Sequence, residues 1–294
     1  MSILALIFVF VFQVYGTPTK IANLKNPAVT ESSGLAASRL NQNIYWTHND
    51  SGDGPLVYAF DTTGESRGVF RVAGAQARDW EDMAIGPGPQ RASSYLYLGD
   101  IGDNDNVRSE IVVYRVAEPK LVATDKTSSK RNPRTTAAAE AIRLRYPDGK
   151  HDAETLLVHP ASGNLYIITK VMLRNATVYE ATAPLVPGRV ITMKRIGEIK
   201  IPSLLGGLFT GGSISPDGRR VALCDYLQGY EVVLPAASKN FNDVWKQTVT
   251  TFSLGQREQG ESITYRADGK ALLATSERTP APLIQVELRL SKSQ

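Results

Sequence analysis

The sequence predicts an all-β fold, because short runs rich in Val, Ile, Leu and Tyr recur along its 294 residues, with Gly, Pro, Asn or Asp between them. A longer pattern also repeats. Polar residues, mostly acidic, come directly before a short apolar run, and the copies begin at Glu31, Asp79, His151, Thr210 and Gln259. Repeats of several short strands are typical of a β-propeller, in which each repeat forms one blade. The sequence therefore predicts a single propeller with five blades.

Each copy is expected to form four antiparallel strands, the first of which follows the polar entrance. The second strands are expected at residues 43–47, 95–98, 165–168, 220–223 and 270–274. The third strands are expected at residues 56–60, 111–115, 177–180, 230–233 and 283–286. Fourth strands for the first four copies are expected at residues 68–72, 141–145, 195–199 and 248–252. These runs are rich in the β-branched and aromatic residues that favour strands.

The fifth copy ends near Leu288 without room for a fourth strand. A short isolated strand at residues 21–24 would supply it, so the two ends of the chain would close the ring within one blade. Closure removes the exposed sheet edge that an open array would leave. The alternative is six blades, with residues 119–152 hiding a divergent copy. That stretch is rich in Lys, Ser, Thr and Pro, which favours an inserted loop.

Residues 3–14 form an apolar block without charge. The block is too short to span a bilayer comfortably and is typical of the apolar core of a signal peptide. We therefore expect a signal peptide at residues 1–16, a propeller domain at 17–294 and secretion, with an uncleaved anchor as the alternative. No second apolar stretch is long enough to cross a membrane, so we expect no membrane contact after cleavage. Glycosylation sequons at Asn49 and Asn175 matter only in a host that glycosylates exported proteins.

Composition excludes several classes of function. The net charge of +4 and the pI near 9.0 are too weakly basic to indicate a nucleic-acid partner, and the basic stretch 126–134 lacks aromatic residues for stacking on bases. The single cysteine, Cys224, excludes an internal disulfide and lies in an apolar run, where we expect it to be buried. Zinc-site spacings and the Gly-x-Ser-x-Gly motif of serine hydrolases do not occur. We expect a monomer.

Acidic residues gather at the predicted centre of the ring. First strands line the channel of a propeller, so the entrances would bring these residues to its axis: Glu31, Asp79, Glu81, Asp82, Asp152, Glu154 and Glu261. Loops 48–53 and 99–105 join second to third strands on the same face and are rich in Asp, Asn and Gly. Oxygen ligands of this kind suit a hard cation, with calcium the first choice. The alternative is a solvated acidic channel mouth that holds no ion.

These residues resemble a known pattern. In the five-bladed calcium-activated nucleotidases, or apyrases, Ser and Glu residues from successive blades surround a central calcium in the order Ser, Glu, Glu, Ser, Glu. The matching residues here are Ser33, Glu81, Glu154, Ser213 and Glu261. The family's Asp-Asp-Arg-Thr-Gly signature is replaced by Asn-Asp-Ser-Gly-Asp at residues 49–53. The Glu at the strand entrance is also similar to that of six-bladed lactonases of the gluconolactonase and paraoxonase type, and to propeller phytases.

The resemblance implies a metal-dependent hydrolase of a phosphate ester or anhydride. The candidate residues for positioning the attacking water are Asp50, Asp53, Asp100 and Asp103. The candidates for holding a small anionic substrate are Lys170, Arg174 and Arg278. Two alternatives stay open: a non-catalytic extracellular binding propeller stabilised by calcium, and a lactonase-like hydrolase. Glycoside hydrolysis fits less well, because it needs carboxylates with separate roles and these look equivalent.

Overall fold

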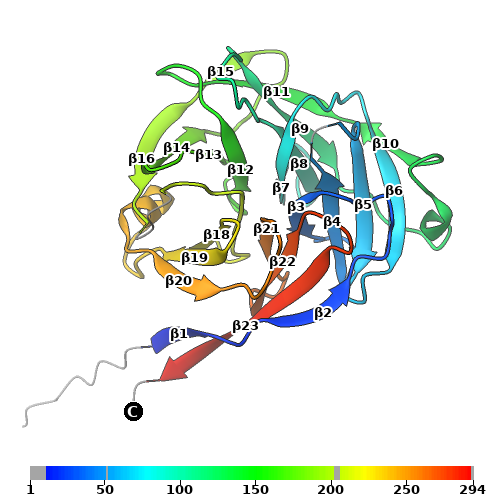
Figure 1. Ribbon diagram of the computed structural model, residues 1–294. Helices are drawn as coiled ribbons and strands as arrows, with labels where there is room; N and C mark the ends of the chain where they lie inside the picture. Colours follow the sequence, from blue (N-terminus) through cyan, green and yellow to red (C-terminus); the bar gives the residue numbers. More distant parts are fainter. Residues whose placement is uncertain (1–10, 51, 202–205, 293–294) are drawn as a thin grey trace, which may run out of the picture.

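The structure is a computed structural model that describes residues 11–50, 52–201 and 206–292. Five sheets stand in a ring around a central channel, so the chain is a five-bladed β-propeller, as predicted (Figure 1). Within the described residues, the helical segments are two short 3-10 turns, η1 (Asp125–Thr127) and η2 (Phe241–Lys246). None of the described helices is long and apolar enough to span a membrane.

The first two blades each hold a meander of four antiparallel strands. Blade 1 contains β3 (Ser32–Ala37), β4 (Ile44–Asn49), β5 (Leu56–Asp61) and β6 (Ser66–Ala73). Blade 2 contains β7 (Trp80–Pro87), β8 (Ser94–Asp100), β9 (Ile111–Ala117) and β11 (Glu140–Arg145). These bounds agree with the predicted second, third and fourth strands to within a few residues.

The other three blades repeat this order. Blade 3 contains β12 (Ala153–Val158), β13 (Leu165–Thr169), β14 (Ala176–Ala181) and β16 (Lys194–Ile199). Blade 4 contains β17 (Gly211–Ile214), β18 (Arg220–Cys224), β19 (Gln228–Val233) and β20 (Thr250–Ser253). Blade 5 contains β21 (Gly260–Tyr265), β22 (Ala271–Ser276) and β23 (Pro282–Lys292), with β2 (Thr19–Asn23) as its fourth strand.

The two ends of the chain close the ring in blade 5. Strand β2 pairs antiparallel with β23, from Thr19 opposite Gln285 to Asn23 opposite Pro282, which confirms the predicted closure. Strand β1 (Val11–Tyr15) pairs with the C-terminal half of β23. Most of the apolar block that predicts the signal peptide lies outside the described residues, so the leader stays a prediction.

The six-bladed alternative is wrong, and the reason lies in the insert between β9 and β12. The insert contributes β10 (Arg134–Ala138), which pairs in parallel with β6 and adds a fifth strand to blade 1. Strand β15 (Val190–Thr192) likewise adds a parallel fifth strand to blade 2. Both strands are short and neither contains a buried residue, so they lack the apolar alternation that makes a strand visible in a sequence.

The core consists of layers between neighbouring blades. One such layer, between blades 1 and 2, packs Trp46 and Phe70 against Met83 and Leu96. The innermost strands β3, β12 and β21 are buried along their whole length, because neighbouring blades cover both of their faces. Cys224 is buried in β18, as expected. A rigid ring of this kind holds the entrances of the inner strands close together.

Candidate metal centre at the channel mouth

Four of the five inner strands carry an extra residue at their entrance. The pairing of β7 with β8 runs from Trp80 opposite Asp100 to Asp82 opposite Gly99, so Glu81 has no partner across the ladder and forms a β-bulge. Ser33, Glu154 and Glu261 stand at the same kind of register shift in blades 1, 3 and 5. Bulges redirect side chains. All four residues are buried where the strands enter the channel.

Blade 4 departs from this pattern, because its inner strand pairs without a bulge. The Asp82 carboxylate accepts the backbone N–H of Leu156 at 3.0 Å and of Gly212 at 3.2 Å. Leu156 stands two residues after Glu154, so the position in blade 4 that corresponds to Glu154 stands two residues before Gly212. That position is Thr210, which is fully buried.

Ser213 therefore lies further along the channel than the other four residues that match the nucleotidase pattern. Its hydroxyl accepts the backbone N–H of Tyr265 at 3.3 Å and lies 3.4 Å from the Thr264 hydroxyl. Thr210 instead donates to the carbonyl of Gly260 in the next blade, at 2.9 Å. The sequence copy in blade 4 contains both a Thr and a Ser, and spacing alone could not tell which of them stands at the entrance.

Among the described residues, three carboxylates come together at the mouth, those of Asp50, Asp79 and Glu81, called the triad below. One oxygen from each lies within 4.8 Å of the others. Asp50 follows β4, and its N–H donates to the carbonyl of Glu31 at 3.2 Å. Glu81 is buried, whereas Asp50 and Asp79 are half-buried. The triad therefore combines a bulge on blade 2 with the loop that leaves the second strand of blade 1.

Backbone hydrogen bonds hold Asp79 in place, and Gly102 leaves room for its carboxylate. Its carbonyl accepts the N–H groups of Ile101 at 3.1 Å and Gly102 at 3.3 Å, so the loop after β8 folds over the triad. A side chain at residue 102 would collide with the carboxylates of Asp79 and Glu81. Gly102 thus leaves open space at the point where these two carboxylates converge.

Electrostatics at the triad favours a positive ligand. Burial raises the pKa of Asp79, and the neighbouring Asp50 carboxylate adds to the rise. Burial also raises the pKa of Glu81 well above its usual range, with further repulsion from Glu154 and Asp50. In the described part of the chain, neither Asp79 nor Glu81 forms an ion pair with a Lys or Arg side chain. A bound cation would relieve this repulsion.

On the other side of the mouth, a lysine side chain supplies the positive charge. The Lys170 ammonium contacts Glu154 Oε1, donates to the Tyr226 hydroxyl at 2.7 Å, and lies 5.2 Å from the centre of the Tyr226 ring. Burial raises the pKa of Glu154 to about 7, although Lys170 opposes the rise. Glu154 Oε2 is buried and has no hydrogen-bond partner among the described residues.

Two further carboxylates complete the acidic mouth. Glu261 accepts the side-chain N–H of Gln259 at 3.0 Å, and burial and Glu154 raise its pKa to about 9. Glu277 pairs with Glu31 in an isolated bridge, and burial and Asp50 raise its pKa to about 7. The sequence prediction did not include Glu277. Its place directly after the second strand of blade 5, where the predicted loops of blades 1 and 2 carry Asp, is the signal that could have found it.

Of the four residues predicted to position water, Asp50 belongs to the triad, whereas Asp53 stabilises the loop in which it lies. Asp53 accepts the Asn49 amide at 2.7 Å and the Tyr58 hydroxyl at 2.7 Å. It also forms an ion pair with Lys130. These contacts tie the loop after β4 to blade 1 and to the insert that carries Lys130.

Asp100 and Asp103 likewise stabilise the loop after β8. Asp100 forms a buried ion pair with Arg108 at 2.8 Å. Asp103 accepts the N–H groups of Val107 and Arg108, both at 2.9 Å. Both carboxylates are almost fully buried, so neither reaches a substrate without a change in this loop.

The three residues predicted to hold an anionic substrate do not form one surface. Lys170 is engaged by Glu154 and Tyr226, as described above. Arg174 is exposed, and Arg278 is exposed and pairs with Glu258 at 3.5 Å. Acidic side chains thus dominate the mouth, with Lys170 as a half-buried counter-charge.

Comparison with known protein families and with curated proteins finds no family and no protein that matches this chain. The five-bladed arrangement implied by the nucleotidase resemblance is present in the structure. Membership of the nucleotidase, phytase or lactonase families stays a prediction.

Proposed function

We propose that this chain is an extracellular propeller that binds a divalent cation, with calcium the first choice, at the triad in the channel mouth. The observation that carries the proposal is the convergence of three carboxylates within 4.8 Å of one another, two of which, Asp79 and Glu81, lie against Gly102. Carboxylates brought this close repel one another unless a cation joins them. Calcium is coordinated by oxygen atoms at about 2.3–2.6 Å, so one ion could contact all three groups.

The composition of the triad favours calcium over other metals. All of its ligand groups are oxygen atoms, whereas zinc and copper sites commonly contain His or Cys. Magnesium requires near-octahedral geometry and tends to retain its waters, whereas calcium accepts irregular sets of carboxylates. The proposed ligands are thus Asp50, Asp79 and Glu81. Of the ring of five inferred from the resemblance, they retain only Glu81.

A thermal denaturation experiment tests the cation. A ligand that binds only the native state raises its stability with the logarithm of the free ligand concentration. We expect calcium to raise the melting temperature and a chelator to lower it. Glu81→Gln should abolish most of this response, whereas Asp105→Asn, which removes the same charge from an exposed position in the neighbouring loop, should retain it. Equal responses of the two variants would argue against the triad.

Metal-dependent hydrolysis of a phosphate ester or anhydride is a second candidate. It is favoured by the exposure of the triad, because two of its three carboxylates are half-buried and a cation there would retain open positions for water and substrate. A screen of nucleoside diphosphates, phytate and lactones with calcium and with chelator decides the matter. Turnover that is lost both in chelator and in Glu81→Gln supports the enzyme. Calcium binding without turnover leaves a binding propeller stabilised by calcium.

A further inference from the structure

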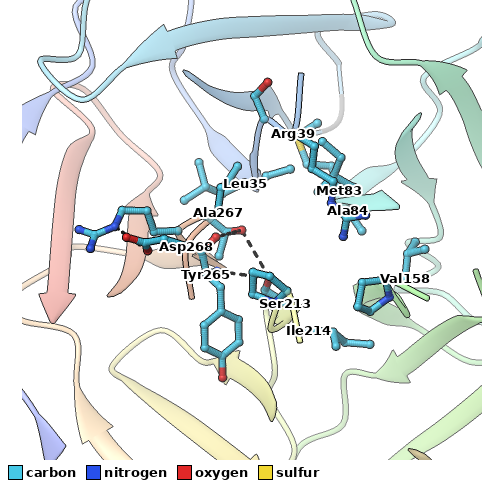
Figure 2. A pocket seen from close by; sticks show the side chains of 18 of the residues that line it. Leu35, Arg39, Met83, Ala84, Val158, Ser213, Ile214, Tyr265, Ala267 and Asp268 are labelled. Carbon is cyan, nitrogen blue, oxygen red and sulfur yellow. Dashed lines mark hydrogen bonds and ion pairs between the residues drawn. The ribbon is translucent and has the colours of Figure 1, made fainter. Parts of the chain in front are cut away.

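A cavity lies at the end of the channel opposite the acidic mouth, because it is lined by the inner strands beyond their entrances. Figure 2 shows this cavity from close by. Its volume is about 950 Å³. Its walls come from the inner strands beyond their entrances and from the loops that follow them, such as residues 38–43 and 266–268. None of the triad residues lines it. Ligand sites in proteins are commonly concave and mostly apolar, with a few well-placed polar groups, and this cavity has that character.

The floor of the cavity is apolar. The inner strands of blades 1 to 4 contribute Leu35, Met83, Leu157, Val158 and Ile214, all of which are buried. These side chains belong to the core layers between blades, so the floor is formed by the same packing that holds the ring together. An apolar body of a ligand would be stabilised where it covers the apolar side chains of the lining that are still accessible to water, such as Leu40 and Ile85.

Arg39 stands at the rim of the cavity (Figure 2). Arg39 is exposed and forms no ion pair with any described residue. Partial desolvation by the surrounding protein lowers the pKa of its guanidinium, an effect that Glu118 and Tyr97 oppose. The other cationic side chain in the lining, Arg266, is paired with Asp268 at 2.9 Å and Glu287 at 3.2 Å. Arg39 is therefore the lining cation best placed to pair with an anion.

The loop that carries Arg39 is held in place by Glu118. This buried carboxylate accepts the backbone N–H groups of Arg39 at 3.3 Å and Leu40 at 3.2 Å. It also accepts the Trp46 indole N–H at 3.0 Å and contacts the Ser38 hydroxyl. A cationic group on an anchored loop loses little freedom when it binds, which is the condition for a pre-organised site.

Ser213 lies on the opposite side of the cavity from Arg39 (Figure 2). Its oxygen accepts the Tyr265 N–H, so its own proton is directed at the Thr264 hydroxyl, 3.4 Å away, or at a ligand. A contact of 3.4 Å is long for a bond between hydroxyl groups, so a better acceptor could replace it.

We propose that this cavity binds a small amphipathic monocarboxylate. The carboxylate pairs with Arg39, and the apolar body lies over the floor toward Ser213, which can donate to a polar group on the ligand. A single unpaired cation in the lining favours a monoanion over a phosphate, which carries more charge. The site shares no residue with the triad, so binding of the carboxylate does not depend on whether the triad binds a cation.

Calorimetric titration of the purified full-length protein with octanoate tests the site. We expect saturable binding of one octanoate per chain, and much weaker binding of acetate, which has the same head group without the apolar body. Arg39→Met keeps the stem of the side chain and removes its charge. A charge-assisted hydrogen bond is typically strong enough that its loss should weaken octanoate binding roughly tenfold or more.

Arg71→Met is the matched control, because Arg71 is an exposed arginine on β6 of the same blade and does not line the cavity. We expect this variant to bind octanoate as the wild type does. The proposal is overturned if octanoate shows no saturable binding to the folded wild type. It is also overturned if Arg39→Met binds octanoate as tightly as the wild type, or if Arg71→Met weakens binding to the same extent.

Discussion

At the scale of single residues, one extra residue at the entrance of a strand determines the chemistry of the mouth. The bulges turn Glu81, Glu154 and Glu261 into a narrow, desolvated channel, where burial raises the pKa of each. Gly102 then allows Asp79 to approach Glu81. A carboxylate in a regular ladder at the same place would point to one face of the sheet and would not meet its counterparts from other blades.

The raised pKa values predict how stability depends on pH. A carboxyl whose pKa is raised in the folded state favours folding below its unfolded pKa, and this contribution is lost as the pH rises through the folded pKa. For Glu154 and Glu277 the window runs from about 4.5 to about 7, and for Glu261 from about 4.5 to about 9. In chelator, we therefore expect the melting temperature to fall between pH 5 and pH 9.

Two comparisons check this pH dependence. Calcium should reduce the fall, because a bound cation stabilises the ionised carboxylates. Glu261→Gln should flatten the part of the curve above about pH 8, where Glu154 and Glu277 are almost fully ionised and Glu261 still titrates. A melting temperature that is constant or rises over this range in chelator would show that the mouth does not contain buried, repelling carboxylates.

At the scale of elements, β2 closes the ring, and Gly64 lies against it. Gly64 has a φ of +78°, and a side chain there would collide with the carbonyl of Asn23 at the end of β2. Gly188 has a φ of +77° with open space around it. Alanine in the left-handed region costs about 1–2 kcal/mol at either position. Gly64→Ala should cost clearly more than Gly188→Ala in chemical denaturation, because it also displaces β2. Equal losses would show that closure by β2 contributes little to stability.

Cleavage of the predicted leader would not undo this closure. Removal of residues 1–16 would take β1 and the Tyr15 hydroxyl, which donates to Glu231 at 2.8 Å. The register between β2 and β23 would stay intact. Glu231 would keep its hydrogen bond from the Tyr265 hydroxyl. We expect secreted protein to begin near Thr17, which N-terminal sequencing can check.

Most strands were predictable because they are buried on both faces and bounded by turn residues. The outer strands β10 and β15 were not, since β10 contains only polar and small residues and β15 has too few residues to show a periodicity. At the site, the acidic entrances followed from the repeat. The sequence could not show that Asp50 belongs to the triad while Asp53, Asp100 and Asp103 stabilise loops. Asp is equally suited to binding a cation and to accepting hydrogen bonds within a loop. Tertiary contacts, such as that between Asp100 and Arg108, decide between the two roles.

At the scale of the whole molecule, the channel has two chemically different ends. One end is a carboxylate mouth with Lys170 as a half-buried counter-charge, and the other is an apolar cavity with Arg39 at its rim. Between them, Asp82 is fully buried and accepts N–H groups from its own strand and from blades 3 and 4. The ring therefore presents a cluster of carboxylates on one face and an apolar cavity with one unpaired arginine on the other.

Calorimetric titration with calcium tests the central claim most directly. The account predicts one tightly bound calcium ion per chain for the wild type and for Asp105→Asn. It predicts binding at least tenfold weaker for Glu81→Gln, since a buried charged ligand is lost while the size of the side chain is kept. A wild type that binds no calcium, or a Glu81→Gln variant that binds it as tightly as the wild type, would contradict the account.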